Sequence, residues 1–411
     1  MKIQQRTLMK LIICFVLFLS IMSNRIIYAN SVDDSNSNSF KANEITLDLA
    51  NGVIVITATG FKQGNSSGSE TQHTGGYIIT GTYPQTSLDT DVISITGGTE
   101  ANPIPITLDN VIIRRSSAEG SLSAGSPISV GSFGTQRLGA HVSLTLKGNN
   151  LLEADSTCAG IELMGQNNVP TETTSLKING DGLLTAKGGA SGAGIGTGMQ
   201  KIAKQQYSVI IESGTINATG GQFGAGIGGG KNGSGGKIII NGGKVNAQGG
   251  NSAAGIGGGI QQTSSSYWDL LTSMDIVING GIVNATGGDY ASGIGTGRVD
   301  INSTTYAANS KELFNITIAG GEINVAGGKQ SAAVGAGYTN YLNYINDNLR
   351  PTNPWQIGKI SISDGELYAL GGRLGAGIGT CIGTHADEIS ITGGSITAIG
   401  GGGLSGYRFG I

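Results

Sequence analysis

Eight aromatic side chains, among them both tryptophans of the chain, have the chemistry to stack on sugar rings. The apolar face of a sugar ring packs on an aromatic ring, and its hydroxyl rim needs polar partners such as the amides interspersed among these residues. The same rings could instead pack their own loops against the body of the protein. The candidates are Tyr207, Tyr267, Trp268, Tyr306, Tyr338, Tyr341, Tyr344 and Trp355.

A row of four asparagines is a second candidate for ligand contact. Apolar residues flank each asparagine, so the alternation of a strand would turn the neighbours inward and the amides outward. Stacked amides at a rung spacing of ~4.8 Å can hydrogen-bond one another. The row therefore fits a stabilising ladder on the exterior, and it also fits recognition of sugar hydroxyls. Its members are Asn217, Asn246, Asn284 and Asn324.

The sequence contains few residue patterns that are typical of catalytic or metal-binding sites. Five acids in the first half of the chain could form an oxygen-rich calcium site or could be ordinary surface acids: Asp89, Asp91, Asp109, Glu153 and Asp155. The acids of the later repeats are scattered, and no pair of them recurs in neighbouring repeats. Examples are Glu212, Glu322, Asp364 and Glu366. The three histidines lack metal-ligand spacing, and no serine nucleophile elbow is present. We therefore expect no enzyme and no cofactor, with calcium as the one ion to consider.

The elements that position these residues follow from a repeat whose clearest copy is Lys237–Gly259, KIIINGGKVNAQGGNSAAGIGGG. Each copy reads as a short apolar strand, a Gly-Gly corner, a second strand ending in alanine, another Gly-Gly corner and Ala-Gly-Ile-Gly-x-Gly. Glycine allows the sharp turns, and the alternation between them is that of β-strands. Three short strands per unit predict an all-β chain that forms a single parallel β-helix of roughly 8–12 coils.

Extra residues accumulate at one place in the repeat, after Ile-Gly-x-Gly and before the next strand. Because equivalent positions stack in a solenoid, inserts at one corner should form a wall along one edge, which is often the binding face. The wall would hold the aromatic candidates. The inserts are Met199–Tyr207, Ile260–Met274, Arg298–Phe314 and Tyr338–Gly358.

The ends of the chain and its charge define the remaining organisation. Residues 1–29 have a basic start, the apolar run Leu11–Met22 and a terminal Ala29, a pattern typical of a secretory signal peptide. We expect residues 30–43 to be a flexible linker, 44–142 an irregular first part and cap of the β-helix, and 143–411 its regular repeats. Without residues 1–29, which hold four of the 24 basic residues and none of the 27 acidic ones, the net charge is 20 − 27 = −7, and this argues against nucleic acid as a partner. No transmembrane anchor is expected once the signal is removed.

A resemblance adds to this interpretation. The segments GYIITGTY, DVISITGG and IPITLDNVII within Gly76–Ile113, followed by VSLTLKGNNLLEADSTCAGI, resemble a bacterial carbohydrate-binding β-helix family with a polysaccharide-lyase-like fold. The GGxVxAxGGxxxAGIGGG coils resemble repeats of Gram-positive surface proteins. The resemblance implies a right-handed parallel β-helix, an extracellular location, binding of polysaccharides such as cellulose or pectin without lytic activity, and room for bound calcium.

Three functions stay open at this point. The first is a secreted or cell-surface, non-catalytic protein that binds a polysaccharide or surface glycan through the aromatic inserts. The second is a structural or adhesive surface protein whose ligand is a protein, such as another cell-wall component. The third is a polysaccharide lyase or hydrolase. Open, coplanar faces of Trp268 and Trp355 would favour the first over the second.

Overall fold

The computed structural model describes twelve stretches of the chain. They are residues 43–64, 68–84, 91–115, 125–132, 138–164, 174–199, 207–233, 235–263, 274–301, 314–339, 355–381 and 384–402. The chain divides into two units, Met1–Glu44 and Ile45–Ile411, and every strand that the structure describes lies in the second unit. The predicted signal peptide and nearly all of the predicted linker lie outside the described residues.

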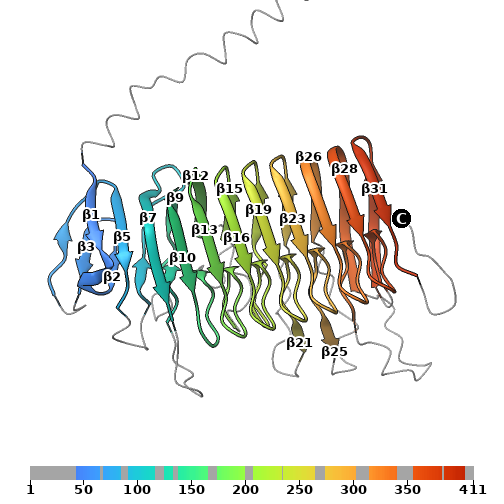
Figure 1. Ribbon diagram of the computed structural model, residues 1–411, viewed down its shortest axis with the longest axis horizontal. Coiled ribbons are helices and arrows are strands. Elements are labelled where there is room, and N and C mark those ends of the chain that lie inside the picture. The colour runs from blue at the N-terminus through green and yellow to red at the C-terminus, as the bar shows by residue number, and fades with distance from the viewer. Residues whose placement is uncertain are drawn as a thin grey trace, which may run out of the picture. The chain divides into compact units, whose positions relative to one another are not determined.

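Most coils of the second unit contain three strands, each stacked on the equivalent strand of the next coil (Figure 1). The first strands are β1 (Ile45–Asp48), β5 (Tyr77–Thr82), β7 (Ile104–Arg114), β9 (His141–Lys147), β12 (Thr174–Gly180), β15 (Tyr207–Ile211), β18 (Lys237–Ile240), β22 (Asp275–Ile278), β26 (Asn315–Ala326), β28 (Trp355–Leu370) and β30 (Thr384–Ile391). The second strands are β10 (Asn149–Glu153), β13 (Leu183–Lys187), β16 (Thr215–Thr219), β19 (Lys244–Gln248), β23 (Ile282–Thr286) and β31 (Ser395–Ile399), while β7, β26 and β28 run on to supply their own. The third strands are β2 (Ile54–Ile56), β6 (Ile93–Ile95), β8 (Ile128–Val130), β11 (Ile161–Leu163), β14 (Ile195–Gly196), β17 (Ile227–Gly228), β20 (Ile256–Gly257), β24 (Ile294–Gly295), β27 (Val334–Gly335) and β29 (Ile378–Gly379).

The stacking is parallel and in register. First and second strands belong to a 17-stranded sheet, and third strands belong to a 12-stranded sheet. In the second strands, for example, Ile216 pairs with Val245 and Val245 pairs with Val283. The predicted all-β parallel β-helix with three strands per coil is confirmed.

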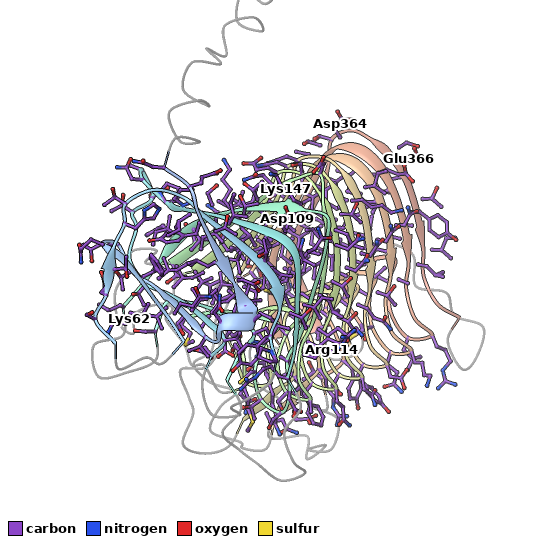
Figure 2. The ribbon with its side chains drawn as sticks, turned by 60° about the vertical axis from the view of Figure 1, so that its left-hand side comes forward. Lys62, Asp109, Arg114, Lys147, Asp364 and Glu366 are labelled. Atoms are coloured by element: carbon purple, nitrogen blue, oxygen red, sulfur yellow. The ribbon has the colours of Figure 1, made fainter. Side chains whose placement is uncertain are left out.

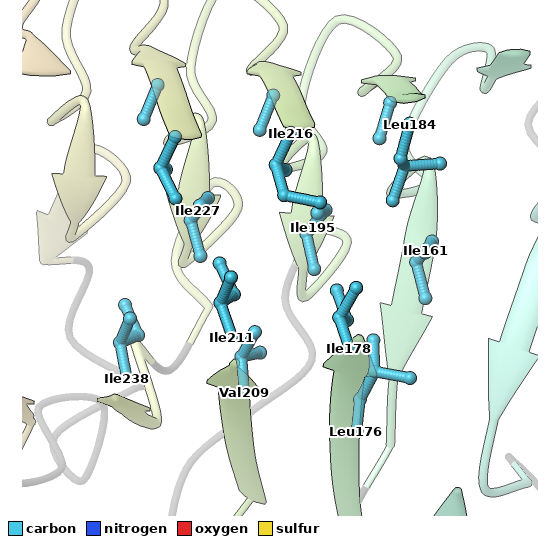
Figure 3. Close-up of a cluster of buried hydrophobic side chains, with 14 of the residues drawn as sticks. Ile161, Leu176, Ile178, Leu184, Ile195, Val209, Ile211, Ile216, Ile227 and Ile238 are labelled. Atoms are coloured by element: carbon cyan, nitrogen blue, oxygen red, sulfur yellow. The ribbon is translucent and has the colours of Figure 1, made fainter. Parts of the chain in front are cut away.

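The core is a set of aliphatic rows that run along the stack. Isoleucine or valine at one position of each later third strand is fully buried, and the rows from the first and second strands meet it from the other sides (Figure 3). Burying such a side chain contributes about 1.5–3 kcal/mol, so a few per coil suffice for a glycine-rich chain. The third-strand row is Ile161, Ile195, Ile227, Ile256, Ile294, Val334 and Ile378.

The glycine after this isoleucine is required by the backbone. Gly228 has φ +130°, and a Cβ atom there would collide with the carbonyl oxygen of Gly257 in the next coil. The same geometry recurs at Gly196 and Gly295. The Ile-Gly-x-Gly motif is therefore a structural element of the third strand, because only glycine adopts this conformation without strain.

Residues 44–142 are already part of the stack. Strands β1, β5, β7 and β9 pair in parallel register, as the later coils do. The irregular feature is antiparallel: β3 (Gly60–Gln63) pairs with β2, and β4 (Thr71–Gln72) pairs with β3. Strand β2 pairs with β6 along one edge and with β3 along the other. Strand β3 therefore covers the edge that the sheet of third strands would otherwise expose at the first coil. A short 3-10 helix, η1 (Leu49–Asn51), follows β1.

The first residues of two inserts also stack. Strand β21 (Gln261–Thr263) pairs in parallel with β25 (Val299–Ile301), and Val299 forms a bridge to Thr339. The inserts therefore leave the β-helix at one corner, as the repeat predicts. Among the described residues, no helix is long and apolar enough to cross a membrane.

Candidate functional site

An open groove of about 390 Å³ crosses the outward face of the first strands β18, β22, β26 and β28. The groove lies on the outward face because strand alternation turns the side chains of Ile238, Ile278 and Ile318 inward, into the core. Its lining residues are Lys237, Asp275, Ile276, Val277, Asn315, Thr317, Lys359 and Ser361.

Hydrogen bonds orient the polar wall of this groove. The Asn315 amide donates to Oδ1 of Asp275 at 3.0 Å, and its own Oδ1 accepts the backbone N–H of Lys359 at 3.0 Å. The Lys359 ammonium lies 2.9 Å from Oε1 of Glu388 in the following strand. Lys237 stands at the other end of the same row, paired in register with Asp275.

The middle of the groove is less polar. Val277 is half-buried between Ile239 and Thr317 in register, and Ser361 follows Thr317. The groove thus combines the aliphatic side chain of Val277 with amide, hydroxyl, ammonium and carboxylate groups at the constant spacing of parallel strands. This arrangement can bind a ligand that has both apolar faces and hydroxyls.

The asparagine row forms a hydrogen-bonded ladder on the second strands. The amide nitrogen of Asn246 lies 2.7 Å from Oδ1 of Asn217, that of Asn284 lies 2.9 Å from Asn246, and that of Asn324 lies 3.4 Å from Asn284. Every bond points the same way along the stack. In β28 the row ends, because Tyr368 takes the asparagine position.

A second polar ladder, which the sequence analysis missed, lies along the first strands and the residues that directly follow them. The Lys177 ammonium is 3.0 Å from Oε1 of Glu212, Asn241 donates to Glu212 at 3.0 Å, and Asn279 donates to Asn241 at 2.8 Å. The hydrogen bonds from Lys177 and Asn241 hold the pKa of Glu212 below its usual value. The signal was present in the sequence, since Asn241 and Asn279 occupy equivalent repeat positions.

Tyr207 is not available for sugar stacking, and that prediction is wrong. Its side chain is 1% exposed, and its hydroxyl donates to the carbonyl oxygen of Gly228 at 3.2 Å. Tyr207 alternates with Val209 and Ile211, which are also buried in β15. It is therefore the first inward residue of the strand, and burial raises its pKa.

Tyr338 is the other predicted stacking residue whose side chain is described. It is half-buried at an insert root, with its ring 5.7 Å from that of Tyr290. The Arg298 guanidinium covers Tyr290 at 4.9 Å and pairs with Asp300 at 2.7 Å. Tyr267, Trp268, Tyr306, Tyr341 and Tyr344 lie outside the described residues, and Trp355 is described only as backbone of β28.

The acids considered for calcium are not brought together. Among the described residues, no three acids, histidines or cysteines are placed to hold a metal ion. Asp91 accepts the N–H of Ser126 at 2.7 Å, Asp109 accepts Asn110 at 2.8 Å, and Asp155 accepts the N–H of Ser156 at 2.6 Å. Asp89 lies outside the described part of the chain.

Glu153 is held by two cations and would not attract a third. Lys187 contacts it at 2.6 Å and Arg114 at 3.1 Å. The hydrogen bond from Lys187 is the main cause of its lowered pKa, with Arg114 adding to the effect. Glu153 thus forms an ion-pair cluster across three coils.

The structure does contain a carboxylate pair on adjacent rungs, contrary to the sequence analysis. Glu322 and Glu366 are paired in register and both are exposed. Figure 2 shows Glu366 beside Asp364 on the outside of the coil. Catalytic carboxylates work in a cleft that excludes water, and these two lie on an open surface.

One comparison identifies the repeat. A family model described as a beta helix repeat matches residues 176–199, 209–231, 238–260 and 276–298. Each match begins within a first strand and extends just past the third, so it spans one observed coil. No curated protein and no solved structure matched the chain. Together with the in-register parallel strands, the repeat defines the chain as a parallel β-helix protein.

Proposed function

We propose that this protein is a secreted or cell-surface β-helix that binds polysaccharide without cleaving it. The groove over β18, β22, β26 and β28 is the observation that carries the proposal. A polymer of hydroxyl-bearing rings needs repeated hydrogen-bond partners and apolar contact. Polar side chains line the groove on all four strands, and Val277 of β22 supplies the apolar contact. The resemblance of residues 1–29 to a signal peptide supports export.

Non-catalytic binding fits the chemistry of the groove better than hydrolysis does. Its one acid, Asp275, accepts a hydrogen bond from Asn315, and the groove lining contains no second carboxylate to complete a glycosidase pair. Its two lysines and its amide can hold hydroxyls or anionic groups. Such a surface supplies affinity and orientation without an acid and base for bond cleavage.

A polysaccharide-binding screen tests the proposal. The full chain and the variants Asn315→Ala and Thr317→Ala would be compared on insoluble cellulose, pectin and mucin, with Thr215→Ala as a matched control outside the groove. We expect one glycan to be retained and its affinity to fall about tenfold, ~1.4 kcal/mol, in each groove variant but not in the control. Retention of proteins only, or equal affinity in all variants, would contradict the proposal.

A further inference from the structure

A second, aromatic surface occupies the later coils on the face of the second strands. Tyr368 pairs in register with Asn324 on one side and with Thr397 on the other. Its side chain is 44% exposed, and its neighbours Leu370 and Ile399 are 41% and 39% exposed. These three are half of the six large hydrophobic residues that are exposed in the described part of the chain. Strands β16, β19 and β23 carry polar residues in the same two rows, for example Asn246 and Gln248 in β19.

The polarity of the asparagine ladder leaves an acceptor beside this ring. Each amide nitrogen donates toward the preceding coil, so Oδ1 of Asn324 is the last acceptor of the row. Among the described residues, no side chain donates to that oxygen. The adjacent row position in β28 belongs to Tyr368, whose ring cannot continue the amide ladder.

Two carboxylates flank the same surface. Glu322 and Glu366 lie two residues before Asn324 and Tyr368, so strand alternation puts all four on one face. Like charges on adjacent rungs repel each other. Hydroxyl groups that donate to these oxygens would reduce the repulsion and satisfy the acceptors.

We propose that Tyr368 is the platform of a subsite for one ring of a neutral glycan. The apolar face of the sugar stacks on the Tyr368 ring and extends toward Leu370, while its hydroxyls donate to Asn324 and to the glutamates. The inference rests on the proposed polysaccharide-binding function and adds a sugar class to it. An anionic sugar is disfavoured, because its carboxylate would face Glu322 and Glu366.

The same charges argue against a dry protein interface on this surface. Such an interface would bury two unpaired carboxylates together with Tyr368 and Leu370, at a cost that their apolar area does not offset. A sugar, in contrast, leaves the carboxylates hydrated at its rim. The combination of one exposed ring with several acceptors therefore favours a small hydroxylated ligand.

Titration of the full chain with two probes tests the subsite. The probes are a neutral gluco-oligosaccharide and a galacturonate oligomer of equal length, each followed by calorimetry and saturation-transfer NMR. Tyr368→Ala should weaken the neutral probe about tenfold, while Tyr368→Phe, which keeps the ring, should change it less than about twofold. Leu138→Ala, at an exposed apolar residue of an early coil, is the matched control and should leave binding unchanged. Glu366→Gln removes one negative charge, so it should reduce the difference in affinity between the neutral gluco-oligosaccharide and the galacturonate oligomer.

The outcomes separate this subsite from the groove. If Asn315→Ala weakens glycan binding and Tyr368→Ala does not, the subsite is overturned and the proposed function stands. If the unmodified protein binds neither probe and no polysaccharide, both fail. If Tyr368→Ala instead abolishes self-association in sedimentation, the surface is a protein contact and the subsite is overturned.

Discussion

The side-chain amide of Asn246 donates to Oδ1 of Asn217 at 2.7 Å and accepts from the amide of Asn284 at 2.9 Å. Each interior asparagine is thus donor and acceptor in one continuous row. The row joins coils that are also held by backbone pairing, the apolar core and the ladder of Glu212, Asn241 and Asn279. The row stabilises the stack of coils on the outward face of the second strands.

Breaking the ladder in its middle should cost more than breaking it at its end. Asn246→Ala removes two hydrogen bonds, so we expect a loss of about 1–2 kcal/mol, whereas Asn324→Ala removes one longer bond and should cost under ~1 kcal/mol. Urea unfolding followed by circular dichroism measures both. Equal losses in the two variants would mean that the row contributes no cooperative stabilisation.

Much of the fold was predictable because glycine and alternation are local signals. The Gly-Gly corners set the strand lengths, and the period of two then assigned residues such as Val245 inward and Asn246 outward. Parallel stacking follows once several units share the frame, since equivalent residues must align. The pairing of Asn217, Asn246 and Asn284 could therefore be inferred before any coordinates.

The site was less predictable, because exposure depends on residues far apart in sequence. The groove requires side chains from four coils separated by inserts of different length, such as Lys237 and Lys359. The insert boundary drawn from the sequence places Tyr207 outside the strand, although its alternation with Val209 marks it as a strand residue. Tyr368 carries a similar signal, because its substitution for asparagine in the repeat marks the end of the ladder.

Gly228 should tolerate no side chain. Gly228→Ala would place a Cβ against the carbonyl of Gly257 at φ +130°, so we expect a loss of at least ~2 kcal/mol and local opening of β17 and β20. Hydrogen exchange of the third-strand amides measures the opening. Gly402→Ala is the control, because no atom lies within 4 Å of its added Cβ. Similar exchange in both variants would contradict the argument.

Substitution of Tyr207 should lower the free energy of unfolding and leave ligand affinity unchanged. Tyr207→Ala removes a fully buried ring and should cost about 3–5 kcal/mol. Tyr207→Phe loses only the hydroxyl, and the Gly228 carbonyl keeps its bond from the Thr197 N–H at 2.9 Å, so the cost should stay near ~1 kcal/mol. Thermal unfolding measures both. Loss of glycan affinity in a Tyr207→Ala protein that remains folded, with Tyr207→Phe unaffected, would restore the stacking role.

Glu153 should make the stability of the early coils depend on pH in the acid range. Lys187, and after it Arg114, hold its pKa below the ordinary 4.5, so its contribution is full above that value and is lost as the pH falls through the lowered pKa of the folded state. The pair is partly exposed, so the effect should be under ~1 kcal/mol and should shrink in high salt. Melting temperatures from pH 7 to pH 3 would show a smaller decline in Glu153→Gln than in the unmodified protein.

The control is Glu388→Gln, whose partner Lys359 lies in a later coil. Its loss should leave the early coils unaffected in residue-resolved hydrogen exchange. An identical pH profile for the early coils with and without Glu153 would show that the two cations do not act through this carboxylate.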